Sequence, residues 1–215
     1  MIVEFGHFLL ALALAAALTQ TALCAYGAKA WSGRALSMGV AAAHLQAALL
    51  AGAFAALIYA FASSDFSVVV VAENSHTDKP LIYKIAAAWG HHEGSMLLWV
   101  LLLAAFGAAV ARDRALPSRF KGWSLAVQGG IGVLFSLFLI VTSNPFARLA
   151  TAPINGRDLN PLLQDPALAI HPPMLYVGYV GSSVVFAFAA AGLIEGRIDA
   201  AWAKWARPWA LLSWT

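Results

Sequence analysis

Long apolar runs separated by short polar segments make up most of this sequence. A helix needs about 20 apolar residues to cross a hydrocarbon core about 30 Å thick, and five runs reach roughly that length. They cover approximately Phe8–Tyr26, Met38–Ala62, His92–Ala111, Trp123–Ser143 and Pro172–Ile194. A sixth run begins near Pro208 and has few residues before Thr215. The pattern predicts an all-α polytopic membrane helix bundle with five complete transmembrane helices and the start of a sixth.

Composition supports this interpretation. Of the 215 residues, 61% are hydrophobic and only 11% are charged, whereas soluble domains are about 25% charged. The mean hydropathy is +0.76. These values exclude a soluble enzyme or binding domain, and we expect residues 1–215 to form a single transmembrane domain in the lipid bilayer. Because the sixth run is cut short, we expect this domain to be the N-terminal part of a longer protein.

The basic residues divide unequally between alternate loops. Nine lie on one predicted side: Lys29, Arg34, Arg112, Arg114, Arg119, Lys121, Arg197, Lys204 and Arg207. Four lie on the other: Lys79, Lys84, Arg148 and Arg157. By the positive-inside rule the first side is cytoplasmic, so the N-terminus is outside and the outer loops cover about 63–91 and 144–171. This distribution accounts for the net charge of +3, and we expect no nucleic-acid partner.

Three shorter segments have patterns of their own. Phe66–Ala72 is rich in β-branched residues, which predicts a short strand in the first outer loop. Asp165 followed by Pro166 has the order of an N-cap and a first helical residue, so a short helix is expected along the outer surface. Asp199–Trp209 carries tryptophans at helical spacing beside basic residues, which predicts a helix lying in the membrane interface.

One candidate site lies in the stretch NPLLQDPALAIHPPMLYVGYVG, Asn160–Gly181. A residue before proline is pushed away from helical geometry, and proline suits the first turn of a helix. Pro172 and Pro173 therefore predict that His171 is the last loop residue above a helix, with its ring free to face a ligand. A surface histidine beside a helix cap is an equally good interpretation at this point. Tyr176 and Tyr179 follow within two turns, as interfacial anchors or as walls of a pocket.

A second unusual stretch precedes the third apolar run. It comprises Trp89, Gly90, His91, His92, Glu93, Gly94 and Ser95. The 16 apolar residues from Met96 to Ala111 span only about 24 Å at 1.5 Å each, so the helix must extend back to roughly His92. A zincin helix requires the order His-Glu-x-x-His, which is absent, and two adjacent histidines point about 100° apart on a helix. We therefore expect no metal site, but an interfacial polar cluster that contacts a partner or cofactor.

Most of the histidines fall on the predicted outer side. They are His7, His76, His91, His92 and His171. This placement favours extracytoplasmic work, and imidazole is a common axial ligand of haem iron. A histidine at the outer rim of a membrane bundle is therefore suited to hold haem at the water boundary.

Together the two stretches resemble a known family. WGHHEGSMLLW, Trp89–Trp99, followed about sixty residues later by Asn160–Gly181, is similar to the N-terminal part of the cytochrome c maturation protein CcmF family. These proteins are the large membrane subunits of bacterial haem lyases. Paralogues from nitrite reductase biogenesis share a closely similar segment. The resemblance extends over essentially the whole chain, including its LLSWT ending.

The resemblance implies an activity and a location. Members hold haem at the extracytoplasmic face of the bacterial cytoplasmic (inner) membrane, for thioether attachment to the CxxCH segment of apocytochrome c. His171 matches the first of two outer histidines that act as axial haem ligands, with Tyr176 and Tyr179 as candidate neighbours. The chain would then be part of a cytochrome c haem lyase, or holocytochrome c synthase, and we do not expect this part to catalyse the reaction alone.

The resemblance also implies cofactors and partners. The haem in transit is haem b, and a further structural b-type haem is expected in the rest of the protein. Expected partners are a periplasmic haem chaperone, apocytochrome c and thiol-handling membrane subunits of the maturation complex. In the family, the second outer histidine, a tryptophan-rich platform and two transmembrane histidines follow later, beyond Thr215. No catalytic residue is assigned in this chain, and the Trp89–Ser95 stretch is assigned only a role in shaping or docking at the outer face.

Two other classes of function remain open from the sequence. A polytopic transporter or respiratory membrane subunit would use His44 and Glu93 as polar stations on a path. It predicts charged residues in mid-membrane, and the apolar runs have almost none. A structural scaffold for partner subunits is the third interpretation.

Overall fold

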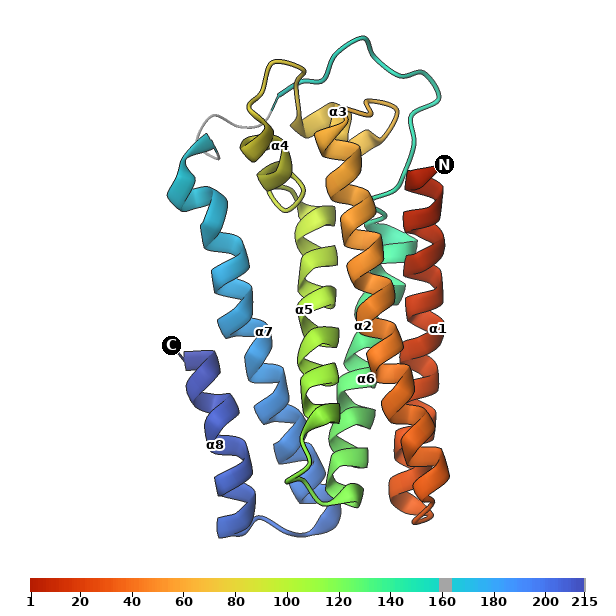
Figure 1. Cartoon of the computed structure of the whole chain (residues 1–215), viewed down its shortest axis with the longest axis vertical. Coiled ribbons are helices and arrows are strands. Elements are labelled where there is room, and N and C mark those ends of the chain that lie inside the picture. Colours follow the sequence, from red (N-terminus) through yellow and green to blue (C-terminus); the bar gives the residue numbers. More distant parts are fainter. Residues whose placement is uncertain (159–163, 215) are drawn as a thin grey trace.

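The computed structural model describes residues 1–158 and 164–214, which form a bundle of helices (Figure 1). The helices are α1 (Ile2–Lys29), α2 (Gly33–Ala62), α3 (Val69–Asn74), α4 (Leu81–Ala87), α5 (His92–Arg112), α6 (Ser118–Thr142), α7 (Pro166–Glu195) and α8 (Ala200–Trp214). Five of them, α1, α2, α5, α6 and α7, are long and apolar enough to cross a membrane. The predicted all-α bundle with five spanning helices is therefore confirmed.

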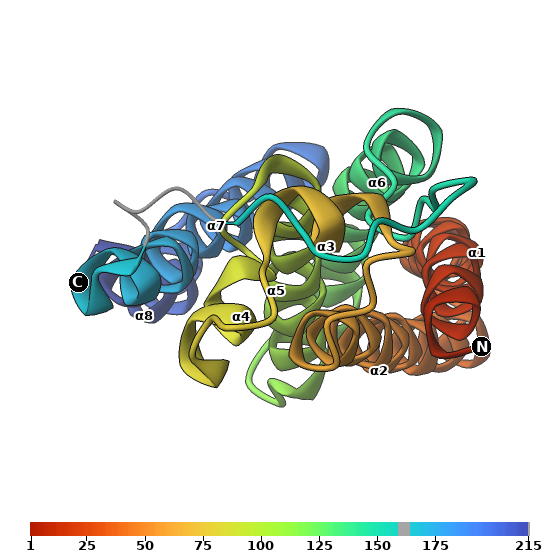
Figure 2. The ribbon, with the colours of Figure 1, turned by 90° about the horizontal axis from the view of Figure 1, so that it is seen from above.

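The long helices alternate in direction, so the bundle has two distinct ends. At the loop end, residues 63–91 and 143–165 connect the helices and carry the short helices α3 and α4. At the turn end, the connections are only residues 30–32, 113–117 and 196–199. Seen from the loop end, α1 packs against α2 and α6, while α5 lies among α2, α6 and α7 (Figure 2).

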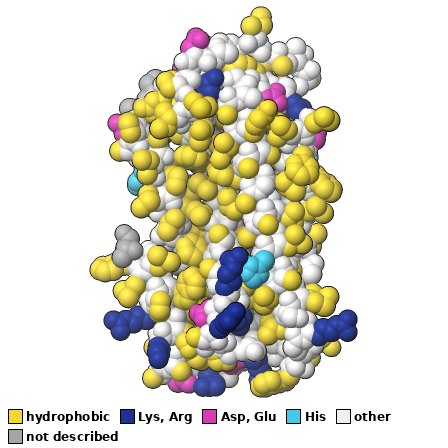
Figure 3. Space-filling model, viewed as in Figure 1, with side chains coloured by type: hydrophobic (Ala, Val, Ile, Leu, Met, Phe, Trp, Pro, Cys, Tyr) yellow, Lys and Arg dark blue, Asp and Glu magenta, His cyan; other side chains and the backbone are white. Residues whose placement is uncertain are grey.

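The side of the bundle is largely hydrophobic, and Lys and Arg gather toward the turn end (Figure 3). The nine basic residues of the predicted cytoplasmic side lie at the turn end or within the neighbouring helical turns, and the other four lie at the loop end. The two charge groups are thus separated along the bundle axis. That the turn end is cytoplasmic and the N-terminus outside remains a prediction from the positive-inside rule.

The predicted strand at Phe66–Ala72 is wrong. Val69–Asn74 forms α3, and extended pairing in this part is limited to one isolated bridge between Val68 and Arg148. Val70 and Val71 are buried by packing under the loop end. The strand prediction rested on the preference of β-branched residues for extended backbone. Here a short helix buries the same side chains, because tertiary packing overrides that preference.

The predicted boundary between a surface helix and a separate spanning helix is also wrong. Asp165 is the N-cap as expected, and its side chain accepts hydrogen bonds from the backbone N–H groups of Ala167 at 2.8 Å and Leu168 at 3.2 Å. The helix that begins there continues without interruption to Glu195. Because the helix begins at Pro166, Pro172 and Pro173 fall in the second turn of α7 rather than in its first.

The segment Asp199–Trp209 does not form a helix lying in the interface. Its residues from Ala200 onward form the first part of α8, which runs back alongside α7 (Figure 1). Trp205 lies 5.2 Å from Phe120 and Trp209 lies 6.4 Å from Phe188, measured between ring centroids. The tryptophans share one face of the helix as predicted, but that face packs on α6 and α7.

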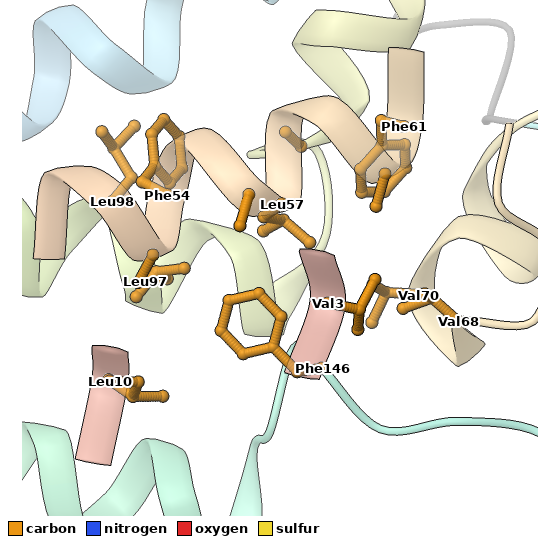
Figure 4. Packing of buried hydrophobic residues seen from close by; sticks show 14 of the residues in the cluster. Val3, Leu10, Phe54, Leu57, Phe61, Val68, Val70, Leu97, Leu98 and Phe146 are labelled. Carbon is orange, nitrogen blue, oxygen red and sulfur yellow. The ribbon is translucent and has the colours of Figure 1, made fainter. Parts of the chain in front are cut away.

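A hydrophobic cluster fills the loop half of the bundle. It joins Val3 and Leu10 of α1, Leu57 of α2, Leu97 of α5 and Phe146 of the 143–165 connection (Figure 4). All of these side chains are buried. Burial of apolar surface stabilises the packing of these side chains, and through Phe146 the cluster holds the start of the connection that follows α6.

An ion-pair group closes the loop end beside this cluster. Arg148 Nε lies 2.6 Å from Glu4 Oε1, and the Arg148 guanidinium lies 3.6 Å from Asp65. Arg148 also donates a hydrogen bond to the hydroxyl of Ser67. Nearby, His7 of α1 is hydrogen-bonded to Asn144. The α1 N-terminus, the start of the first long connection and the second long connection are thereby joined.

Helices α1 and α2 approach closely at Gly39. A Cβ atom added there would lie 2.5 Å from Cys24 Sγ and 3.0 Å from the Cys24 backbone nitrogen. Cys24 is fully buried. Small residues permit this kind of close helix contact in membranes.

We predict that Gly39→Ala destabilises the bundle by about 1–3 kcal/mol, because the added methyl forces the two helices apart. The measurement is the thermal unfolding midpoint of the intact protein in detergent. Gly130→Ala is the matched control, since a Cβ there meets nothing closer than 4.0 Å. Equal midpoints for the two variants would contradict the close-packing interpretation.

Candidate functional site

His171 lies inside α7 and its side chain is exposed. The prediction that it is the last loop residue is wrong: the N-cap at Asp165 places it in the second helical turn. The ring makes no hydrogen bond or ion pair with any other described residue. The helix therefore presents an imidazole whose nitrogen lone pair is available to a ligand at the loop end.

The two tyrosines after His171 lie differently. Tyr176 is half-buried and packs against the loop-half hydrophobic cluster. Tyr179 is 69% exposed. Tyr176 thus anchors α7 on the bundle, whereas the ring of Tyr179 lies on the outside of the helix.

The Trp89–Ser95 stretch contacts the helix that carries His171. The indole Nε1–H of Trp89 donates a hydrogen bond of 2.8 Å to the backbone carbonyl of Ala169, eighty residues along the chain. The Trp89 ring is stacked on Phe54 of α2, with centroids 6.3 Å apart and 25° between the planes. The two sequence motifs are therefore in direct contact in the folded protein.

His91 acts as the N-cap of α5. Its Nδ1–H donates to the carbonyl of Ala87 at 2.8 Å, and its Nε2 accepts from the backbone N–H of Gly94 at 3.2 Å. This pattern requires the neutral tautomer with the proton on Nδ1. Burial lowers the pKa of His91 from its usual value, which favours that neutral form. With both ring nitrogens engaged, His91 does not present a free lone pair to a ligand.

Gly94 and Ser95 close the turn that His91 caps. A Cβ at position 94 would lie 1.8 Å from the carbonyl oxygen of Ala88, so the backbone approach there requires glycine. The Ser95 hydroxyl donates a hydrogen bond of 2.6 Å to the carbonyl of Trp89. The turn from Ala88 to Ser95, which we call the motif turn, is thus held by its own side chains, with Gly90 as part of its backbone.

His92 points away from His91. Its Nε2 shares a hydrogen bond of 3.1 Å with the hydroxyl of Ser143 at the end of α6, and its ring lies edge-on to Phe138. His91 instead lies against Phe61 of α2, with ring centroids 5.5 Å apart. The two rings therefore serve different helices, in keeping with the expectation that they do not bind one ion together. Glu93 is half-exposed and makes no hydrogen bond or ion pair with the described residues.

The two polar stations of the transporter interpretation are not linked in the described structure. The Nδ1 of His44 bonds to the carbonyl of Val40 on its own helix at 2.8 Å. Glu93 lies in the first turn of α5 at the loop end. Among the described residues, no hydrogen bond or ion pair joins the two.

The contacts that organise this end were only partly visible in the sequence. Glu4 pairs with Arg148, far along the chain, as well as with the N-terminal amine, and the sequence did not indicate the Arg148 pairing. The Trp89–Ala169 bond was not foreseen either. The sequence does contain an indication of it. Pro173, four positions after Ala169, has no N–H, so the Ala169 carbonyl can accept a hydrogen bond only from a donor outside the regular helical pattern.

Comparison with known proteins decides the family. The family model described as cytochrome C assembly protein matches residues 89–215, more than half of the chain. The chain belongs to this family. Residues 89–95 of the motif turn and the whole of α7 lie within the matched part.

Relatives in this family are similar over the full chain. The cytochrome c-type biogenesis protein ccl1 of Rhodobacter capsulatus is 62% identical over 100% of this chain and 33% of that protein. CcmF of Escherichia coli K12, also described as a cytochrome c-type biogenesis protein, is 48% identical over 100% of this chain and 33% of that protein. The chain thus spans about a third of the length of these relatives.

A solved structure shares the fold. The cytochrome c heme lyase CcmF superposes with a TM-score of 0.88 at 30% identity, covering 100% of this chain and 34% of that chain. The expected resemblance to the CcmF family is therefore confirmed. The chain is a multi-pass membrane component of the cytochrome c biogenesis type.

We predict that the motif turn loosens as the pH falls below about 6.5, the pKa of histidine in an unfolded chain. The folded-state pKa of His91 is lowered, so the opened state takes up a proton first and stability is lost on acidification. The measurement is amide hydrogen exchange of residues 92–96 in the intact protein from pH 7.5 to 5.5, corrected for intrinsic rates.

His91→Asn is the matched variant. Asparagine is a good N-cap acceptor and does not titrate in this range. The acid-dependent part of the exchange should therefore disappear in His91→Asn. Persistence of the same pH dependence in that variant would show that another group is responsible.

Proposed function

We propose that this chain is the N-terminal membrane part of a cytochrome c haem lyase. In this role it helps to hold haem at the extracytoplasmic face of the bacterial inner membrane for attachment to the CxxCH segment of apocytochrome c. The observation that carries the proposal is an exposed, unpartnered His171 at the loop end of a bundle in the cytochrome C assembly family. Relatives described as cytochrome c-type biogenesis proteins and a solved structure described as a heme lyase support it.

His171 is the residue of this chain that we assign to haem, as one axial ligand of the iron. Imidazole nitrogen is a usual axial ligand, and the exposed ring on a helix has no internal bond to break before it binds. Its role is to orient the macrocycle, so that the vinyl groups face the incoming thiols. Tyr179, exposed two turns further along, and Tyr176, packed on the bundle, are the aromatic neighbours on the same helix.

The reaction itself needs little from this chain. Each cysteine thiol of the apocytochrome adds across a vinyl group: a carbon–sulfur bond forms at the inner vinyl carbon and the thiol hydrogen goes to the outer one. Electrons balance without an added oxidant or reductant. Holding the reacting groups in the productive geometry is the contribution expected from the membrane protein.

The rest of the site belongs to the longer protein. By resemblance to the family, a second outer histidine and a tryptophan-rich platform complete the site for haem b, and transmembrane histidines bind a further structural b-type haem. A periplasmic haem chaperone would deliver haem, and thiol-handling membrane subunits would keep the apocytochrome cysteines reduced. Each of these assignments is part of the proposal.

We predict that His171→Ala in the intact protein lowers the yield of mature periplasmic cytochrome c by at least about tenfold, because one haem ligand is lost. Covalent haem staining of periplasmic protein measures the yield. His76→Ala is the control, since His76 lies in the other loop-end connection and is hydrogen-bonded to Asn155. Maturation at the parental level in His171→Ala would overturn the assigned role.

A further inference from the structure

Two consecutive prolines create an unusual need in α7. In an α-helix the carbonyl of residue i accepts a hydrogen bond from the N–H of residue i+4. Pro172 and Pro173 have no N–H, so the carbonyls of Leu168 and Ala169 lose their intrahelical donors. Both carbonyls belong to the helical turn that leads into His171.

The Ala169 carbonyl has a donor from outside the helix. The indole Nε1–H of Trp89 lies 2.8 Å from it, a good length for a neutral hydrogen bond. We propose that Trp89 is a positioning residue for His171: its indole N–H replaces the missing N–H of Pro173 and holds the first turns of α7 in place. The consequence for haem rests on the proposed function. The attachment of α7 through Trp89, which we call the tether, rests on geometry alone.

The first turns of α7 have little else to hold them. None of the residues 166–176 is buried, in contrast to the lower half of the same helix, where Val184 and Phe188 are fully buried. Within the described part of the chain, the Trp89 bond is the one hydrogen bond between residues 166–176 and another element. Figures 1 and 2 show this part of α7 at the edge of the bundle, next to α4.

Trp89, by contrast, is rigidly mounted. Its backbone N–H donates to the carbonyl of Ala86 at 3.1 Å, and its own carbonyl accepts from the Ser95 hydroxyl. Its ring is stacked on Phe54, a residue of the loop-half hydrophobic cluster. The position of the indole N–H is therefore fixed by the bundle. Its hydrogen bond in turn holds the first turns of α7 at a defined position relative to the bundle.

The contacts of the motif turn hold Trp89 in place. His91 caps α5, Gly94 permits the close backbone approach and Ser95 bonds to Trp89. Each contact fixes the turn from which the indole projects. In this proposal His91 does not contact the ligand. It helps to position Trp89, and Trp89 is the residue that contacts α7, the helix that carries His171.

The test uses Trp89→Phe in the intact protein, which keeps an aromatic ring beside Phe54 but removes the indole N–H together with part of the ring. We expect hydrogen exchange of residues 166–176 to rise about tenfold, since a carbonyl loses its partner. Trp99→Phe is the matched control, because Trp99 lies on the same helix as the motif and contacts Phe135 through its ring. Unchanged exchange in Trp89→Phe would overturn the tether.

A double-mutant cycle tests the replacement of the proline N–H. Pro173→Ala restores a backbone donor four residues after Ala169. In that background Trp89→Phe should change the exchange of residues 166–176 less than about twofold, because the carbonyl now has an internal partner. An equally large effect in both backgrounds would contradict the replacement and assign the loss to ring packing.

The haem arm separates this inference from the proposed function. Haem absorbance of the purified intact protein and the yield of periplasmic cytochrome c should fall in Trp89→Phe and recover in the Pro173→Ala background. If His171→Ala lowers both readouts and Trp89→Phe lowers neither, positioning is overturned. If His171→Ala lowers neither while the exchange results hold, the haem role fails and the tether stands.

Discussion

The loop end of this protein depends on one close backbone contact, between Gly94 and the carbonyl of Ala88. A side chain as small as methyl would collide there with an atom that cannot rotate away. Because the chain passes so near itself, His91 reaches the N-terminus of α5, and Ser95 reaches the carbonyl of Trp89. The direction of the tryptophan ring, and with it the bond to α7, follows from a contact that has no chemistry of its own.

Hydropathy predicted the spanning helices because the bilayer leaves the backbone few alternatives. With no water in the hydrocarbon core, each segment must satisfy its own hydrogen bonds, and helices do so. The start of α5 followed from length alone: sixteen apolar residues were too short, and the helix begins at His92 as the sequence predicted. Outside the hydrocarbon core the sequence predicted structure less well. At α3, for example, either a short helix or a short strand can bury the valines, so the sequence pattern did not distinguish them.

The candidate site was predictable as residues but not as contacts. His171 could be singled out from its neighbours in sequence, while its place within a helix could not, since the local rule for a residue before proline competes with the strong cap at Asp165. The carbonyl that accepts the Trp89 hydrogen bond and the carboxylate that pairs with Arg148 each lie eighty or more residues away in sequence. Pairings over such distances are set by which helix ends meet in space, and no periodicity in one segment records them.

Helix α7 is fixed firmly at one end of its length and lightly at the other. Its lower half is packed among buried side chains, and its first turns rely on a few contacts and one hydrogen bond. In the haem role that we propose, a ligand bound to these first turns could be released without unpacking the core. Pro172 and Pro173 leave two carbonyls without donors inside the helix. The weaker attachment of the first turns is therefore encoded in the sequence itself.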